Sequence, residues 1–441
     1  MHDKQRPVRV GIVGLGTVGG GAFNLLKANA DEIARRTGRP ILVSHIGSRR
    51  DHPGCDTQGV KVSRDVFAVV HDPEIDVLVE VMGGTTIARE VVTQALESGK
   101  HVVTANKALL AEHGNEIFAL AEARGRFVAF EAAVAGGVPI IKVLREGLAA
   151  NRIHAVAGII NGTGNFILTE MRDKARDFID VLKEAQELGY AEADPTFDVE
   201  GIDAAHKLTI LAALAFGIPL QFSKVYTEGI SALTTLDVAY ATELGYRIKH
   251  LGLTRRTGDG IEMRVHPTLI PCDRLLSHVD GVKNAVLVLA DPVGSTLYYG
   301  SGAGAGPTAS AVVADLVDVV RAMQDHSPDA RARVPHLAFQ PDALNDTPIL
   351  PMSQVETAFY LRLMVEDRPG VLAEVTGILS RQGINIEAII QKPAHDAGII
   401  PVIILTRPVL EQHMNDAISA MASIPVLREP VVRIRVESLD A

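Results

Sequence analysis

The chain has 441 residues, of which 47% are hydrophobic, and a formal net charge of −10. This length predicts two to four domains, each with a core of its own. Charges of both signs are spread along the chain without a basic stripe, which argues against nucleic acid as the main partner. The sequence contains no run of about 18 apolar residues, so we expect no membrane span.

Cysteine usage and the N-terminus bear on the cellular compartment. Cys55 and Cys272 are the two cysteines, too few for a disulfide framework and without metal-ligand spacing. The first residues lack the apolar core of a signal peptide. We therefore expect a cytoplasmic protein.

Residues 1–150 alternate short apolar runs with amphipathic stretches such as Ile87–Leu96. Alternation of this kind predicts a Rossmann-type doubly wound parallel sheet, an α/β fold with helices on both faces. The expected strands are Val8–Val13, Ile41–Ile46, Asp76–Met82, Lys100–Thr104 and Phe127–Phe130.

Residues 151–323 follow a different pattern and are expected to form an α+β domain for catalysis and dimerisation. Strands are predicted at Arg152–Ile160, Ile261–His266 and Ala285–Ala290, and an apolar helix at Gly201–Phe216. A further helix, residues 308–323, is expected to pack back on the first domain. The proline-rich residues 324–353 have the composition of a linker.

Residues 354–441 restart as a separate unit. Ala358–Val365 alternates apolar and polar side chains, which predicts a half-buried strand. A helix around residues 371–379, strands at Ile384–Ile390 and Ile399–Thr406, a helix near Leu410–Ala422 and a strand near Val431–Val436 complete the order βαββαβ. This order is typical of a ferredoxin-like domain.

A glycine motif, Gly14-Leu15-Gly16-Thr17-Val18-Gly19, follows the first strand and opens a helix. Gly14 permits the tight turn, Gly16 lets a pyrophosphate approach the backbone, and Gly19 permits close packing of helix and strand. In this position the motif predicts dinucleotide binding, with Thr17 and Val18 at the helix start.

The end of the second strand bears on the choice of cofactor. Arg49 and Arg50 follow it and suit the 2′-phosphate of NADP(H), which we favour. The alternative is a solvated basic turn in which Asp51 binds the ribose of NAD(H).

Two further strand ends point to the same edge of the sheet. One strand runs into Gly83 and Gly84, and the next runs through Thr104 to Lys107. Ligands of open α/β sheets lie beyond the carboxyl ends of the strands. Lys107 is therefore expected at the cofactor and substrate crevice, unless it is an ordinary surface lysine.

A cluster of acidic residues precedes the apolar helix of the middle domain. Asp203 and Lys207 are four residues apart and share a helix face. A lysine at the start of a buried helix is costly unless it is paired or functional, although an ordinary ion pair on a wet face also fits. Glu192 and Asp198 can receive an ammonium group, and the lysine can donate to a carboxylate or a carbonyl oxygen.

The sequence around the two cysteines argues against one class of dehydrogenase reaction. Oxidation of an aldehyde to an acyl phosphate needs a cysteine nucleophile, and neither Cys55 nor Cys272 lies in a catalytic type of turn. Interconversion of an aldehyde and an alcohol by direct hydride transfer is the simpler chemistry. A sensor that binds a dinucleotide and an amino acid without turnover is the rival from another class.

At this point the chain resembles homoserine dehydrogenase over nearly its whole length. The matching segments are residues 14–19, 79–84, 104–108, 130–140, 161–168, 188–195, 201–207 and 302–308. The resemblance implies NAD(P)H-dependent reduction of aspartate 4-semialdehyde to homoserine, in the biosynthesis of threonine, methionine and isoleucine.

The resemblance also implies residue roles. Lys207 would donate the proton, while Lys107 would contact cofactor and substrate and is the rival donor. Glu192 and Asp203 would hold the substrate, with Asp198 nearby, and Gly189 and Gly304 would approach the cofactor. A monovalent cation, Na⁺ or K⁺, would bind at Glu131, Val134, Gly136 and Val138.

The tail resembles an ACT domain, a type that binds amino acids. Asp367 and Gly370 lie in its strand-to-helix turn, and Asn385 lies before its second strand. The resemblance implies threonine as an effector at these residues, and a homodimer or homotetramer. The alternative is a tail that only mediates oligomerisation.

Overall fold

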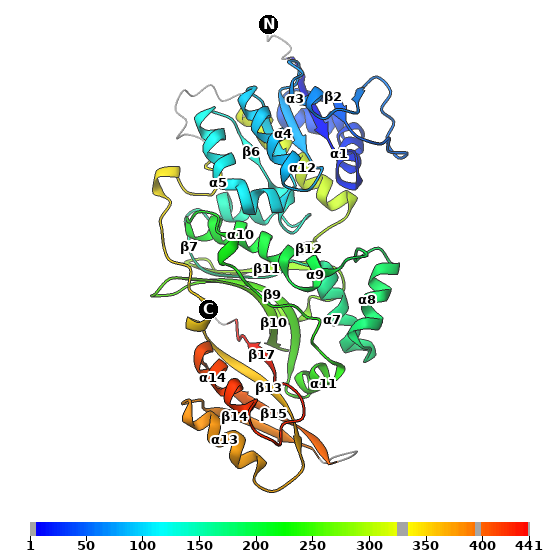
Figure 1. Cartoon of the computed structure of the whole chain (residues 1–441). Helices are drawn as coiled ribbons and strands as arrows, with labels where there is room; N and C mark the ends of the chain where they lie inside the picture. Colours follow the sequence, from blue (N-terminus) through cyan, green and yellow to red (C-terminus); the bar gives the residue numbers. More distant parts are fainter. Residues whose placement is uncertain (1–5, 324–333, 393–397, 440–441) are drawn as a thin grey trace. The chain divides into compact units, whose positions relative to one another are not determined.

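The computed structural model describes residues 6–323, 334–392 and 398–439. The chain is divided into two compact units. The first unit comprises Met1–Gly162, Asp203–Val225 and Val282–Thr347, and the second comprises Thr163–Ile202, Tyr226–Gly281 and Pro348–Ala441. Each unit is therefore built from three segments of the sequence (Figure 1).

The first unit contains a six-stranded parallel sheet in the order β3-β2-β1-β4-β5-β6. Its inner strands are buried on both faces along nearly their whole length, which confirms the predicted parallel sheet. The strands are β1 (Val8–Val13), β2 (Ile41–Gly47), β3 (Lys61–Ser63), β4 (Val77–Glu80), β5 (His101–Thr104) and β6 (Val128–Ala129).

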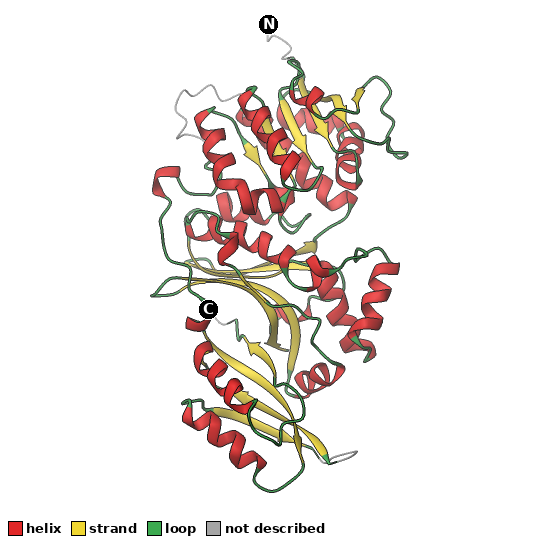
Figure 2. Ribbon diagram, in the orientation of Figure 1, coloured by secondary structure: helices red, strands yellow, loops and turns green. Residues whose placement is uncertain are grey.

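Helices cover both faces of this sheet (Figure 2). They are α1 (Thr17–Ala28), α2 (Ala30–Thr37), α3 (Phe67–Val70), α4 (Thr86–Glu97), α5 (Lys107–Ala123) and α12 (Ala305–Ala322). Helix α12 comes late in the sequence but packs against α1, and Val312 and Leu316 are buried in one core with Val10 and Ile12.

The first unit also holds three antiparallel strands in the order β12-β11-β7 and the buried helix α10, apart from the first residue of that helix. Their bounds are β7 (Arg152–Ile159), β11 (Lys283–Asp291), β12 (Gly294–Ser301) and α10 (Ile202–Phe216). Nearly every residue of α10 is buried, as its apolar sequence predicts.

In the second unit, β9 (Tyr246–Arg256) and β10 (Ile261–Pro271) form a long antiparallel hairpin. Strand β17 (Val432–Val436) runs parallel to β10 and antiparallel to β13 (Glu356–Glu366). Helices α7 (Gly162–Lys174), α8 (Phe178–Glu187), α9 (Thr196–Val199) and α11 (Thr235–Glu243) belong to this unit, apart from the first residue of α7.

The tail forms the predicted ferredoxin-like domain. Its remaining elements are α13 (Val371–Arg381), β14 (Ile386–Gln391), β15 (Ile399–Thr406) and α14 (Glu411–Met421), and the sheet order is β17-β13-β15-β14. Val375 of α13 and Met414 of α14 share a core with Leu361, so both helices cover one face of this sheet (Figure 2).

The prediction of a half-buried strand at Ala358–Val365 is wrong. Tyr360 and Arg362, on the face expected to be polar, are buried as well. The reason lies in α11, because Arg362 Nε donates to Asp237 Oδ1 at 2.7 Å, and Tyr360 packs with Val238 in a second core. The opposite face of the tail sheet is therefore also covered.

Part of the segment predicted as a linker, residues 324–353, forms backbone hydrogen bonds with other elements. Residues 324–333 lie outside the described residues, but Ile349 forms a β-bridge with Ile261, and Asn345 N donates to Gly217 O. Among the described residues, no helix has both the length and the apolar character needed to cross a bilayer.

Candidate active site

The turn between β1 and α1 has the geometry that the glycine motif predicts. A Cβ on Gly19 would lie 1.9 Å from the carbonyl oxygen of Gly14, so this position requires glycine. A Cβ on Gly16, in contrast, would meet nothing within 4 Å. The first turn of α1, with Thr17 and Val18, has no side-chain cap on its amide groups. Open space before free amides suits a pyrophosphate.

Arg49 and Arg50 follow β2 and are exposed. A third arginine, Arg64 after β3, donates to Ser48 O at 3.1 Å and to Asp51 Oδ1 at 2.8 Å. Arg64 is therefore bound to Asp51, the carboxylate proposed as the alternative ligand for the ribose of NAD(H). The positive charge gathered here suits a 2′-phosphate, and the sequence reasoning had missed Arg64 because it lies on a different strand end.

The ends of β4 and β5 place Gly83, Thr104 and Lys107 at one edge of the sheet, because Glu80 and Thr104 are partners in register. Gly83 has a φ of 76°, and a Cβ at this position would meet no other atom within 4 Å. The Thr104 hydroxyl is fully buried and donates to Glu80 Oε2 at 2.7 Å. Any contact from Thr104 to a cofactor would therefore come from its backbone.

Asp203 lies between two lysines of the first unit. Lys207 Nζ is 2.6 Å from Asp203 Oδ2, and Lys107 Nζ is 3.0 Å from Asp203 Oδ1. Lys207 Nζ also donates to Ile160 O at 2.7 Å, and Asn161 Nδ2 donates to Asp203 Oδ2 at 2.9 Å. We refer to Lys107, Asp203 and Lys207 as the lysine–aspartate cluster.

The cluster is buried at its carboxylate and more open at its cations. The side chain of Asp203 is 5% exposed, that of Lys207 is 12% exposed and that of Lys107 is 35% exposed. Burial alone would raise the pKa of Asp203, but the charges of Lys207 and Lys107 outweigh it and hold this pKa well below its usual range. The carboxylate therefore stays ionised, and the cluster keeps an excess positive charge.

An excess positive charge at a half-open position can stabilise a developing oxyanion and donate a proton to it. The i,i+4 spacing of Asp203 and Lys207 predicted their pairing. The sequence did not assign Asn161 or the carbonyl of Ile160 to this site. Their one signal was the Asn-Gly-Thr-Gly motif, whose first residue is Asn161.

The loop proposed for a cation begins at Glu131, at the end of the parallel sheet. Both carboxylate oxygens of Glu131 accept backbone amides, from Ile141 at 2.9 Å and from Lys142 at 2.8 Å. Burial raises the pKa of Glu131, although these hydrogen bonds oppose the shift. Val134, Gly136 and Val138 follow in the same loop, and the described residues show no cluster of three or more His, Cys, Asp or Glu that would hold a metal.

Gly304 is the residue before α12 and has a φ of 112°, a conformation that favours glycine. In the second unit, Gly189 and the exposed Glu192 lie in the segment between α8 and α9, and Asp198 lies on α9 and is half-buried. In the tail, Asp367 follows β13, Gly370 caps α13 and Asn385 precedes β14, and all three are exposed.

Comparison with known proteins gives the family. The family model "Homoserine dehydrogenase" matches residues 139–317, "Homoserine dehydrogenase, NAD binding domain" matches residues 14–131, and "ACT domain" matches residues 359–422. A homoserine dehydrogenase of Pseudomonas aeruginosa is 66% identical over 99% of this chain and all of its own length. The chain belongs to the homoserine dehydrogenase family.

Other homoserine dehydrogenases agree with this assignment. The enzyme of Neisseria gonorrhoeae is 56% identical over 99% of this chain and its whole length. The crystal structure of a homoserine dehydrogenase from Thiobacillus denitrificans has a TM-score of 0.93 and 61% identity, covering 98% of this chain and 99% of its own. The protein is thus an oxidoreductase acting on a CH–OH group, with an NAD(P)-binding domain, a small-molecule substrate and an ACT domain.

Proposed function

We propose that this homoserine dehydrogenase reduces aspartate 4-semialdehyde to homoserine with NADPH, and that Lys207 donates the proton. The observation that carries the proposal is the pair of contacts at Lys207 Nζ, to Asp203 Oδ2 at 2.6 Å and to Ile160 O at 2.7 Å. These contacts fix the ammonium group in a nearly buried position. Lys107 Nζ lies 3.0 Å from Asp203 Oδ1, and its side chain is more exposed than that of Lys207, which suits a residue that binds cofactor and substrate.

In the proposed reaction, NADPH would be held with its pyrophosphate at Gly16 and the first turn of α1, and it would supply the hydride that reduces the aldehyde carbon. Lys207 transfers a proton from its ammonium group to the carbonyl oxygen, so that the C=O bond becomes CH–OH and Lys207 becomes neutral. Asp203 holds Lys207 in place through one carboxylate oxygen and contacts Lys107 through the other. Glu192 and Asp198 stay predictions from the sequence, as acceptors for the ammonium group of the substrate.

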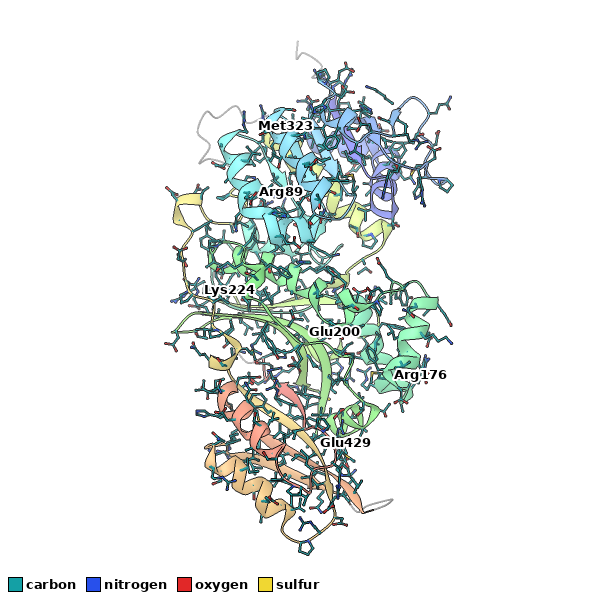
Figure 3. All side chains as sticks on the ribbon, viewed as in Figure 1. Arg89, Arg176, Glu200, Lys224, Met323 and Glu429 are labelled. Carbon is teal, nitrogen blue, oxygen red and sulfur yellow. The ribbon has the colours of Figure 1, made fainter. Side chains whose placement is uncertain are left out.

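The test is the oxidation of NADPH by the purified enzyme with aspartate semialdehyde. Turnover should fall about 10²–10⁴-fold in Lys207→Ala, the usual effect of a lost general acid. Lys224→Ala, an exposed lysine outside the cluster (Figure 3), is the matched control and should be unaffected. Binding of NADPH without turnover in the wild type would instead support the sensor hypothesis.

The preference for NADP(H) over NAD(H) is supported by Arg49, Arg50 and Arg64. A hyperthermophilic archaeal homoserine dehydrogenase, 27% identical with a TM-score of 0.60 over 71% of this chain and 98% of its own, was solved in complex with NADPH. The ratio of kcat/KM for NADPH and NADH tests this preference directly.

The proposed cation site takes Na⁺ or K⁺ at Glu131 and the carbonyl groups of Val134, Gly136 and Val138. A buried carboxyl whose pKa is raised by burial gains from a cation, and each carboxylate oxygen can accept more than one partner. Thermal unfolding in NaCl, KCl and choline chloride of equal strength tests it. A midpoint that is the same in all three salts would contradict a specific site.

Feedback control by threonine is the proposed role of the ACT domain, with Asp367, Gly370 and Asn385 at the effector site. The three residues follow or precede regular elements at exposed turns, where a ligand has access. Inhibition of NADPH oxidation by threonine, reduced in Asn385→Ala, tests this role. Absence of inhibition would leave oligomerisation as the function of the tail, and light scattering tests the proposed homodimer or homotetramer.

A further inference from the structure

Glu80 is a fully buried carboxyl group at the carboxyl end of β4, a central strand of the parallel sheet, and it has no role among the residues assigned above. It is the last residue of β4 and lies in register with Val13 of β1 and Thr104 of β5. Its carboxylate oxygens accept hydrogen bonds from two neutral groups, the hydroxyl of Thr104 and the backbone amide of Met82. Burial raises the pKa of Glu80, and these hydrogen bonds only partly oppose the shift. Burying a carboxyl group costs free energy of folding, and hydrogen bonds to neutral groups compensate only part of this cost. The cost suggests that the hydrogen bonds of Glu80 serve a purpose other than stability.

The hydrogen bonds of Glu80 connect two turns at the cofactor edge of the sheet. Glu80 Oε1 accepts from Met82 N at 2.9 Å, which holds the start of the Gly83–Gly84 turn. Glu80 Oε2 accepts from Thr104 Oγ1 at 2.7 Å, and Thr104 Oγ1 in turn accepts from Asn106 N at 3.0 Å. One carboxyl group therefore contacts both strand ends.

Asn106 closes this network and sets the start of α5. Its Nδ2 donates to Gly84 O at 2.7 Å, and its Oδ1 accepts from Leu109 N at 3.1 Å as the N-cap of the helix. Lys107 is the first residue of α5, and its Nζ lies 3.0 Å from Asp203 Oδ1. The position of Lys107 relative to Asp203 thus depends on the same hydrogen bonds that shape the Gly83–Gly84 turn.

We propose that Glu80 is a positioning residue of the enzyme: its buried carboxyl group fixes the Gly83–Gly84 turn and, through Thr104 and Asn106, the N-terminus of α5 with Lys107. This inference rests on the proposed role of the cofactor edge and of Lys107. Displacements of about 1 Å at such a site lower rates by up to about 100-fold. Because Glu80 is fully buried, it acts through these two turns and not by touching the ligands itself.

The test compares Glu80→Gln with Glu80→Met. Glutamine keeps the shape and an acceptor for Met82 N, so kcat and the KM for NADPH should stay within about 3-fold of wild type. Methionine fills the space without these hydrogen bonds, so kcat should fall about 10- to 100-fold and the KM for NADPH should rise. The rescue by glutamine is the readout that a purely space-filling role would not give.

A second pair of variants guards against misfolding. Thr104→Ser keeps the hydroxyl donor and should resemble wild type, whereas Thr104→Val removes it at nearly constant volume and should repeat the loss seen in Glu80→Met. If Glu80→Met and Thr104→Val fold and keep kcat and the KM for NADPH, the proposal is wrong.

Binding of NADPH, measured by quenching of its fluorescence, separates this inference from the proposed function. If the wild type binds NADPH but does not reduce the semialdehyde, the proposed function fails. Weaker NADPH binding in Glu80→Met than in Glu80→Gln would still support the positioning role in that case, and equal binding would contradict it.

Discussion

Two regions of the molecule bury charged side chains, and they do so in different ways. In the first unit, the lysine–aspartate cluster sets two cations against one carboxylate, and its cations are partly exposed. In the second unit, the buried Arg264 and Arg435 belong to groups in which each cation is matched by a carboxylate. The first group is Arg255, Glu262, Arg264 and Glu437, and the second is Glu228, Glu411, Arg433 and Arg435.

The difference lies in what remains for a ligand. We call the eight residues of the second unit the arginine network. There, Arg264 Nη2 is 2.6 Å from Glu437 Oε1, and Arg435 Nη1 is 2.9 Å from Glu228 Oε2. A balanced and closed network joins β10 to the tail but has no net charge to offer. An unbalanced cluster with an open side can bind an anion or protonate an oxyanion.

The largest expected effect is a loss of stability without a loss of activity when the arginine network is broken. Glu437→Ala leaves Arg264 and Arg255 without one of their partners, and breaking a buried pair costs about 3–5 kcal/mol. Urea unfolding should show this loss, while kcat of the folded variant should match wild type. Glu429→Ala, an exposed carboxylate of the same unit (Figure 3), is the control. A fall in kcat without a loss of stability would overturn the comparison.

The next effect is an acid sensitivity of the second unit. Burial lowers the pKa of His250 from its ordinary 6.5 to about 4, and burial holds the pKa of His266 well below its usual range. The unfolded chain therefore binds protons at a higher pH than the folded chain does, so stability falls as the pH drops from 6.5 to 4. For His250 alone the loss is about 3 kcal/mol. Unfolding midpoints across this range should fall, and less steeply in His250→Gln.

The lysine–aspartate cluster, in contrast to the histidines, should lose no stability between pH 6.5 and 4, because the pKa of Asp203 is low. Because Asp203 ionises well below its usual range, the ion pairs with Lys207 and Lys107 persist throughout the interval in which the histidines titrate. The stability that they contribute is lost only at a pH below the ordinary Asp pKa. A stability profile that is flat between pH 6.5 and 4 would contradict the histidine account.

A third effect concerns activity within the cluster. Asp203→Asn keeps the shape but leaves Lys107 and Lys207 as like charges without a carboxylate between them. We expect kcat to fall about 100-fold, because Lys207 loses the contact that orients it. Steady-state NADPH oxidation measures the change. The outcome that would count against the cluster is a variant with wild-type kcat at the same folded fraction.

The smallest effect is in cofactor choice. Removing the guanidinium groups in Arg49→Ala/Arg50→Ala should lower kcat/KM for NADPH about 10-fold and leave that for NADH nearly unchanged, since each lost contact to a phosphate is partly exposed. Parallel assays with the two cofactors give the ratio. An equal loss with both would show that the arginines do not contact the 2′-phosphate.

The sequence predicted those parts of the fold in which burial follows composition. Val8–Val13 was placed to the residue because a continuous apolar run is buried on both faces of the sheet. Strand β9 was missed because Lys249, His250 and Thr254 interrupt its apolar pattern, although all three are buried. Lys249 Nζ donates hydrogen bonds to Asp280 Oδ1 and to the carbonyl of Val279. The sequence around Lys249 gives no sign of these partners, because they lie about 30 residues further along the chain.

The same limit applies to the candidate site. The glycine turn and the Asp203–Lys207 pair rest on short spacings, which a sequence displays. The contact of Lys107 with Asp203 joins residues far apart in the chain, as do those of Glu80 with Thr104 and of Arg362 with Asp237. These contacts depend on tertiary packing, which places side chains from different elements together.

The most direct test of the central claim is the rate of hydride transfer in a single turnover of Lys207→Ala, with NADPH and semialdehyde both saturating. The account predicts that the folded Lys207→Ala enzyme transfers hydride about 10²–10⁴-fold more slowly than wild type, because Lys207 acts on the reaction. Lys107→Ala should mainly raise the KM for cofactor and substrate. A wild-type rate in Lys207→Ala together with a lost rate in Lys107→Ala would contradict the account and make Lys107 the donor.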